Sequence, residues 1–325
     1  MQLPLVSVII PNYNYAQFLE QRIDSVLNQS YLNIEVILLD DASTDHSLQV
    51  IENYRFDSRI SHIKINSLNS GSPFSQWKKG LELASGKYVW IAESDDYADL
   101  SFLSITVPLL EKYVEASFCF AGGYRVDESG CIMKLDYDRW GRKQKTSRKG
   151  YNVFNGTEYI LHNLFWRSYV YNASGVLFRR DLAVNLDFDL CISMHCSGDW
   201  LFWTEMARFG QVIEVYKKLN YCRYHMNSAS TQAKKTGKSL EEDMVVVGQI
   251  EKYYFLHLSY YKRTLRHGIF YKKIMRAPIT NEMKKKLYEK LKQNFKSGIE
   301  AYFLERFNKF LSVLPCVLTE KRDRL

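Results

Sequence analysis

Three carboxylates follow one apolar run of the chain within four residues. The run at residues 88–92 is β-branched and aromatic, which is typical of a buried parallel strand, and Glu93, Asp95 and Asp96 come directly after it. Crowded carboxylates repel one another unless a cation neutralises them, and oxygen ligands of this kind suit Mg²⁺ or Mn²⁺. The cluster therefore predicts a divalent-metal site that shares its ion with substrate phosphates. A solvated acidic turn is the alternative.

A second acidic pair, Asp40 and Asp41, follows another apolar run at residues 34–39. Because ligands bind at the carboxyl ends of the strands in an open α/β sheet, both acidic clusters are expected on the same rim. One carboxylate there can accept hydrogen bonds from a nucleotide base or from ribose hydroxyls, while the other holds the metal that bridges a diphosphate. A helix-entry cap is the alternative interpretation of the second pair.

Alternating strands and helices must position these clusters. Apolar runs predict the strands, and apolar residues at helical spacing predict the helices between them. The expected strands are residues 6–10, 34–39, 62–65 and 87–92, and the expected helices are residues 16–29, a helix capped by Ser43 or Thr44, and residues 75–84. This alternation predicts an α/β fold with a Rossmann-like, mostly parallel sheet that is flanked by helices.

The pattern changes along the chain. Residues 1–100 indicate a nucleotide-binding type of α/β unit, and the part that follows, to residue 230, mixes helices and strands. The strands expected there are residues 117–120, 175–178 and 212–216. Beyond a polar linker at residues 228–238, residues 239–325 are expected to form a basic helical region. The prolines expected to break it are Pro278 and Pro315.

Composition narrows the class of protein. A chain of 325 residues with 46% hydrophobic content can bury a full core. Its 44 basic side chains exceed 36 acidic ones, and this excess, concentrated toward the end, favours an anionic partner or a solvated basic face. The six cysteines lack zinc spacing and are expected to be reduced thiols. With no secretory signal and no apolar run of about 18 residues, the protein is expected to be cytoplasmic, or peripheral on the inner face of the cytoplasmic membrane.

The chain carries three ordered motifs, at residues 6–14, 25–31 and 40–45, and together they resemble the amino-terminal signature of family 2 glycosyltransferases. The acidic cluster stands where those enzymes carry their D-x-D motif, and the resemblance covers residues 5–230. It implies a GT-A catalytic domain at residues 1–230, whose acceptor-binding half is residues 101–230, with a helical C-terminal extension. It also implies transfer of a sugar, with inversion, from a nucleoside diphosphate donor.

The resemblance assigns roles to individual residues. Those around the donor nucleotide are Pro11, Tyr13, Glu20 and Asp41, and Asp41 accepts a hydrogen bond from the base. Asp95 coordinates the divalent ion, Mn²⁺ or Mg²⁺, and Asp96 lies near the sugar or the metal. The donor is expected to be a UDP-sugar, and the acceptor a glycan or a lipid-linked sugar.

Two departures from the family pattern change these expectations. Glu93 replaces the commoner Asp, so its extra methylene favours a contact with the ribose over ligation of the metal. The family's arginine–asparagine pair is replaced within residues 76–79, so no base contact from arginine is expected. Lys78 or Lys79 is the expected source of positive charge near the nucleotide, and Trp77 is expected to belong to the core.

A third chemical site lies at residues 197–203. Taken alone, Asp199 is a helix N-cap, but the resemblance makes it the general base that takes the proton of the acceptor hydroxyl. His225 lies in a stretch where relatives often carry a histidine that reaches the metal or a phosphate, and Arg223 is a weaker candidate. Asp199 is thus the expected catalytic residue, and His225 the expected second metal ligand.

The C-terminal helices interleave aromatic residues with lysine and arginine. This pattern fits peripheral membrane contact and fits packing against the catalytic domain equally well. It also fits single-stranded nucleic acid by composition, but no nucleic acid is expected because no RNA-binding signature accompanies it.

The expected function is thus inverting glycosyl transfer in the synthesis of a bacterial surface polysaccharide such as capsule, O-antigen or exopolysaccharide. A catalytically inactive glycan-binding or scaffolding protein of the same fold is the alternative. A sugar-1-phosphate nucleotidyltransferase is disfavoured, because residues 11–14 replace the glycine-rich, arginine-containing loop that it needs. A dinucleotide oxidoreductase is disfavoured as well, because no G-x-G-x-x-G follows the first strand.

Overall fold

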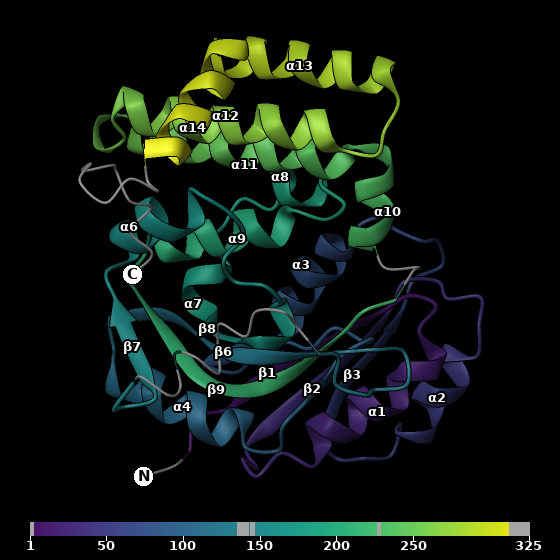
Figure 1. Ribbon diagram of the computed structural model, residues 1–325. Coiled ribbons are helices and arrows are strands. Elements are labelled where there is room, and N and C mark those ends of the chain that lie inside the picture. The colour runs from purple at the N-terminus through teal and green to yellow at the C-terminus, as the bar shows by residue number, and fades with distance from the viewer. Residues whose placement is uncertain (1–2, 135–142, 144–146, 226–228, 312–325) are drawn as a thin grey trace. The chain divides into compact units, whose positions relative to one another are not determined.

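The computed structural model describes residues 3–134, 143, 147–225 and 229–311, and it is shown in Figure 1. The chain forms two compact units that are each discontinuous in sequence. The first, here called the sheet unit, comprises Met1–Gly156, Val170–Ser193 and Glu205–His225. The second, here called the helical unit, comprises Thr157–Tyr169, Met194–Thr204 and Met226–Leu325.

The first half of the sheet unit is a parallel sheet of order β3-β2-β1-β4. Its strands are β1 (Val6–Asn12), β2 (Ile34–Asp40), β3 (Ile60–Ile65) and β4 (Tyr88–Ile91). The connecting helices are α1 (Ala16–Leu27), α2 (Ser47–Asn53) and α3 (Pro73–Leu83). Every residue of β1 and β4 is buried, as expected for strands covered on both faces. The predicted parallel α/β arrangement is confirmed.

The second half of the sheet is mixed, and the order continues β4-β8-β6-β9-β5. Its strands are β5 (Tyr97–Ala98), β6 (Ala116–Val126), β7 (Tyr151–Phe154), β8 (Val176–Arg179) and β9 (Gln211–Arg223). Strand β8 is antiparallel to β4 and β6, β9 is parallel to β6, and both β5 and β7 are antiparallel to β9. The helices of this half are α4 (Phe102–Lys112), α7 (Arg180–Ala183) and α8 (Asp189–Ile192). Strands β6 and β9 exceed their predicted lengths because they pair with each other as far as Val126 and Arg223.

One predicted helix start is wrong. Helix α2 begins at Ser47 rather than after Ser43 or Thr44. The Ser43 hydroxyl instead accepts from the backbone N–H of Asn14 at 2.9 Å, and the Thr44 N–H donates to the Asn14 side chain at 2.7 Å. Both capping candidates are therefore bound to the loop that follows β1.

The helical unit contains most of the C-terminal region. A short helix, α6 (Gly156–Tyr159), leads into a π-helical turn at Ile160–Leu164, and residues up to Thr204 of α9 (Gly198–Ala207) also belong to this unit. The remaining helices are α10 (Ala229–Thr236), α11 (Lys238–Tyr254), α12 (Tyr260–Arg276), α13 (Asn281–Phe295) and α14 (Ile299–Leu311). In the described part of the chain, no helix has the length and apolarity needed to cross a membrane.

Two predictions for this region can be compared with the structure. The polar linker is wrong, because α10 occupies most of it. The break at Pro278 is confirmed, since it separates α12 from α13. Pro315 lies outside the described residues.

Candidate functional site

The two acidic clusters meet at the carboxyl ends of neighbouring parallel strands. Asn12 at the end of β1 pairs in register with Asp40 at the end of β2 and donates to its carboxylate at 2.9 Å. The turn after β4 lies beside the same end of β1, because the Ser94 hydroxyl donates to the Pro11 carbonyl. Both clusters thus lie at one edge of the sheet, as parallel strands require.

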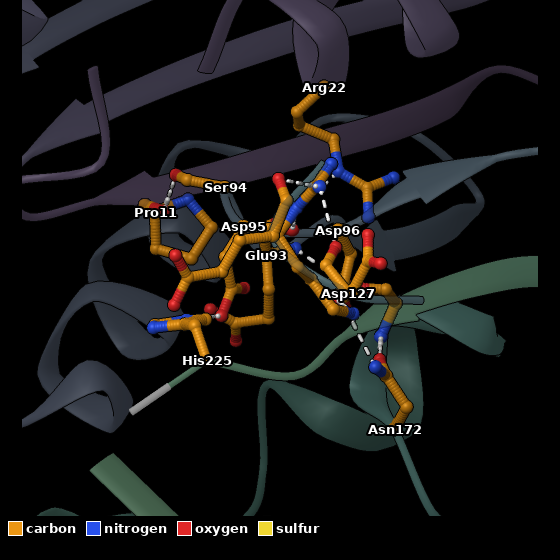
Figure 2. A network of polar contacts seen from close by, with 12 residues as sticks. Pro11, Arg22, Glu93, Ser94, Asp95, Asp96, Asp127, Asn172 and His225 are labelled. Carbon is orange, nitrogen blue, oxygen red and sulfur yellow. Dashed lines mark hydrogen bonds and ion pairs between the residues drawn. The ribbon is translucent and has the colours of Figure 1, made fainter. Parts of the chain in front are cut away.

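Asp95 and His225 form the part of this edge that is suited to a metal. Figure 2 shows the two side chains together, with His225 Nε2 3.0 Å from Asp95 Oδ2. The hydrogen bond to Asp95 raises the pKa of His225. The rings of Tyr15 and Phe18 pack against the imidazole, with centroid-to-centroid distances of 5.3 and 5.7 Å. No group of three or more potential ligands occurs among the described residues. The Asp95 carboxylate fits Mg²⁺ or Mn²⁺, which commonly complete their coordination with substrate phosphates and water, and His225 would ligate through Nε2 once it is deprotonated.

Asp96 is occupied by protein donors. Its carboxylate accepts from Asn172 Nδ2 at 2.6 Å, the Ser174 hydroxyl at 2.7 Å and the Arg223 N–H at 2.8 Å. Burial, followed by the charge of Asp95, raises the pKa of Asp96. The bonds tie the turn after β4 to residues 172–174 and to the end of β9, so this side chain holds Asp95 in place.

Glu93 is bound on both its backbone and its side chain. Its Oε1 accepts from the Trp77 indole at 2.9 Å, and its N–H donates to Ser174 Oγ at 3.1 Å. Burial and the nearby Asp95 raise the pKa of Glu93 to about 8. Trp77 is fully buried, as expected for a core residue, but it also orients this carboxyl group.

Arg22 supplies a buried positive charge beside the acids, which the sequence analysis missed. It is inaccessible to solvent, and its Nε donates to the Glu93 carbonyl at 2.8 Å (Figure 2). Neither Nη atom has a hydrogen-bond partner among the described residues. Burial lowers the pKa of Arg22 to about 10, while the charges of Asp96, Asp95 and Glu93 oppose that shift. One signal was available: Arg22 lies four residues after Phe18 and four before Val26, on the apolar stripe of α1.

Asp41 is enclosed by four protein donors. It accepts from Asn66 Nδ2 at 2.6 Å, from Gln76 Nε2 at 2.7 Å, and from both the N–H and the hydroxyl of Ser70 at 3.0 and 2.7 Å. Gln76, which stands within the segment that departs from the family pattern, therefore binds Asp41 directly. Its own Oε1 is buried and has no partner among the described residues, which leaves one free acceptor beside Asp41.

The other residues expected around the nucleotide have different surroundings. Tyr13 is 45% exposed beyond β1, whereas Pro11 is buried. Glu20 is exposed on α1. The pKa of Tyr54 is raised first by burial of its side chain, then by Asp24, and to a smaller extent by the charge of Glu20. Lys78 is also exposed. The neighbouring Lys79, rather than Lys78, joins the Asp41 network by donating to Asn66.

Arg223 holds the end of β9 rather than presenting its charge to solvent. Its Nε donates to the Asp95 carbonyl at 2.8 Å, and its other nitrogens donate to the carbonyls of Asp127 and Glu128 and to Gln21. It fixes the backbone that carries His225.

Asp199 lies in the helical unit, in the first turn of α9. Since α9 begins at Gly198, Asp199 is not the N-cap, and its Oδ1 accepts from the next N–H, that of Trp200, at 2.6 Å. Burial, together with the charges of Asp243 and Glu242, raises the pKa of Asp199 to about 7. A carboxylate of that pKa can take a proton efficiently near neutral pH.

The chain was also compared with known proteins. The model of the family described as Glycosyl transferase family 2 matches residues 7–185, a range that includes Asp41 and Asp95 and ends before Asp199. An uncharacterized glycosyltransferase of Haemophilus influenzae is 35% identical over 144 residues, which are 42% of this chain and 57% of that protein. The putative teichuronic acid biosynthesis glycosyltransferase TuaG of Bacillus subtilis is 43% identical over 94 residues, 29% of this chain and 36% of that protein. The chain thus covers less than two thirds of either relative.

Solved structures share the fold at low sequence identity. S. aureus TarS in complex with UDP-GlcNAc has a TM-score of 0.55 and 18% identity, with 95% of this chain and 79% of that chain covered. The mannosyltransferase PcManGT from Pyrobaculum calidifontis, in complex with GDP-Man and Mn²⁺, has a TM-score of 0.50 and 14% identity, with coverages of 97% and 82%.

The fold and the family follow from these findings. The architecture is that of a GT-A glycosyltransferase, so the predicted fold class is confirmed. The chain belongs to glycosyl transferase family 2, as its motifs predicted.

Proposed function

We propose that this protein is an inverting glycosyltransferase that moves a sugar from a nucleoside diphosphate donor to a hydroxyl group of a glycan or lipid-linked acceptor. The observation that carries the proposal is the Asp95–His225 pair at the carboxyl end of β4, on the same sheet edge as the Asp41 network. UDP-GlcNAc bound to TarS supports a UDP-sugar donor. TuaG supports a role in bacterial surface polysaccharide synthesis.

The sheet unit binds the donor in this proposal. Asp95 and His225 would hold a divalent ion, Mn²⁺ or Mg²⁺, which when bound supplies positive charge to the donor diphosphate. The Mn²⁺ in the PcManGT complex supports the use of a divalent ion. Asp41 and the free acceptor atom of Gln76 recognise the base. Pro11, Tyr13, Glu20 and Lys78 line the nucleotide side, Glu93 contacts the ribose, and Asp96 lies near the sugar.

The helical unit activates the acceptor. As the acceptor oxygen attacks the anomeric carbon, the new C–O bond forms on the face opposite the diphosphate, and the bond to the diphosphate oxygen breaks. Asp199 takes the proton that the acceptor hydroxyl loses. Its raised pKa, about 7, suits this transfer at neutral pH.

The proposal can be tested with purified protein, Mn²⁺ and a panel of nucleotide sugars, by following released nucleoside diphosphate. Asp199→Asn should abolish transfer but leave donor binding by calorimetry unchanged, whereas Asp95→Ala should weaken donor binding in the presence of Mn²⁺. Normal transfer by Asp199→Asn would refute the base assignment. Donor binding without transfer to any acceptor would favour a glycan-binding role instead.

We also propose that α14 contacts the inner face of the cytoplasmic membrane. The buried face of this helix carries Ala301, Glu305 and Asn308. Glu305 pairs with Lys272 at 3.2 Å, and Asn308 accepts from Tyr261 at 2.8 Å. Its opposite face carries apolar side chains that are each more than half exposed: Ile299, Phe303, Phe307 and Phe310. Exposed Arg306 and Lys309 accompany them, so the face complements an apolar surface with anionic groups, as in an interfacial helix.

Flotation of the full chain with phosphatidylglycerol-containing vesicles tests this contact. Changing Phe303, Phe307 and Phe310 to Ser should reduce binding by at least about 100-fold. Only the exposed parts of these side chains, 61%, 57% and 62%, can still be buried, so each contributes about 0.9 kcal/mol when full burial is worth about 1.5 kcal/mol. Phe56→Ser is the control, because Phe56 is 92% exposed but lies in the sheet unit. Absence of flotation, or a triple variant that instead changes oligomeric state, would contradict membrane contact.

A further inference from the structure

The backbone just before α9 is bound by a single carboxylate of α11. The N–H groups of His195, Cys196 and Ser197 donate to Glu242 at 2.8, 2.9 and 3.0 Å. The Cys196 thiol lies 3.1 Å from the same carboxylate. Glu242 is only 3% exposed. Burial raises the pKa of Glu242, but these hydrogen bonds lower it by more and hold it below its ordinary value. The side chain is therefore anionic.

Further contacts fix both sides of Asp199. The Ser197 hydroxyl donates to Asp243 at 3.1 Å, and Asp243 in turn accepts from Lys273 of α12 at 3.1 Å. On the other side, the buried indole of Trp200 donates to the Leu164 carbonyl at 3.0 Å. Asp199 thus lies on a short segment that is held at both ends.

We infer that Glu242 is a positioning residue for Asp199, so that helix α11 of the C-terminal region takes part in activating the acceptor. The inference rests on the proposed role of Asp199 as base. It goes beyond that role because it gives a positioning role to a helix of the region for which the sequence pattern fits packing, membrane contact or, by composition alone, nucleic acid.

The chemistry of the contact requires a carboxylate. One oxygen of Glu242 accepts from two N–H groups, and the other accepts from the third. Glutamine has only one acceptor oxygen, and its amide N–H would face a backbone N–H. Glu242→Gln therefore keeps the shape but loses at least one bond, while Glu242→Asp keeps the acceptors on a shorter arm.

Cys196 provides a readout of this contact that does not depend on activity. Burial and the hydrogen bond to Glu242 raise the pKa of its thiol, which keeps it unreactive. In Glu242→Gln, alkylation of Cys196 by iodoacetamide, measured by mass spectrometry of its peptide, should become at least about tenfold faster. Exposed Cys131 serves as the internal reference.

Activity is measured on the same variants. Glu242→Gln should lower kcat by about 10- to 100-fold, because small displacements of a catalytic group are costly, while the donor KM and nucleotide binding stay unchanged. Glu242→Asp should recover part of that loss. The matched control is Glu241→Gln on the same helix, whose side chain pairs with Lys290 and should leave both readouts unchanged.

The outcomes separate this inference from the proposed function. Faster alkylation of Cys196 with a kcat equal to that of Glu241→Gln would overturn the positioning role. Unchanged alkylation in Glu242→Gln would overturn the anchoring itself. Asp199→Asn should lose transfer while Cys196, which keeps its hydrogen bond to Glu242, is alkylated more slowly than in Glu242→Gln. Normal transfer by Asp199→Asn would instead refute the base.

Discussion

The protonation of Asp199 leads to a quantitative prediction about pH. With a pKa of about 7, Asp199 is about one tenth ionised at pH 6, one half at pH 7 and nine tenths at pH 8. If Asp199 is the base, kcat should therefore rise about tenfold between pH 6 and pH 8 at saturating donor. The assay is release of nucleoside diphosphate across pH 5.5–9.

Asp243→Asn should move this profile in a known direction. The variant removes a negative charge that raises the pKa of Asp199. Loss of the Asp243 charge favours the ionised base, so the acid limb should shift to lower pH, and Glu241→Gln should not move it. A flat profile, or a shift to higher pH in Asp243→Asn, would refute the reasoning.

Ionisation of Asp199, which should raise kcat, should lower the stability of the folded chain. The pKa of Asp199 rises from its ordinary value of 3.8 to about 7 in the folded chain, so the folded state binds more protons between these values. The contribution of Asp199 to the free energy of unfolding therefore falls as pH rises from about 4 to about 7, and it stays level above that. Asp199→Asn should thus be more stable than the native chain at pH 8, by on the order of 1–2 kcal/mol for a half-buried group, and not at pH 4. Urea unfolding at both values measures this, and equal effects at both would contradict the raised pKa.

Three further predictions concern donor binding and packing. Asp95→Ala and His225→Ala should each weaken donor binding in the presence of Mn²⁺ at least about tenfold, as measured by calorimetry. When the metal is chelated, the same variants should have little effect. An equal loss of affinity in both conditions would contradict metal ligation. Arg22→Met removes the buried positive charge beside three carboxylates and should lower the free energy of unfolding in urea by about 3 kcal/mol; a neutral result would show that the acids need no internal cation. Gly268→Ala should lower the free energy of unfolding by several kcal/mol, because the added Cβ would lie 2.2 Å from the Ala301 carbonyl oxygen. In the control, Gly248→Ala, the nearest atom is 3.9 Å from the added Cβ, so stability should be unchanged or slightly higher. Similar melting temperatures of the two variants would contradict the close packing of α12 and α14.

The sequence by itself determined the parallel half of the sheet and the edge at which its acids meet. Continuous apolar runs that end in Asp40 and Glu93 are local patterns, and parallel pairing places their ends together whatever lies beyond. The pattern of 325 residues was also enough to predict the family. Helix starts were less predictable, because Ser43 and Thr44 could bond to α2 or to the loop after β1, and only the folded loop decided between them.

Only the tertiary structure decided how the acidic residues differ from one another. Asp96 and Asp41 are enclosed by protein donors, while Asp95 meets His225, 130 residues away in the chain. In the same way, Glu242 binds the backbone before Asp199 across 45 to 47 residues. The physical reason is that a hydrogen bond depends on distance in space, and no local periodicity records which distant donor a buried carboxylate will meet.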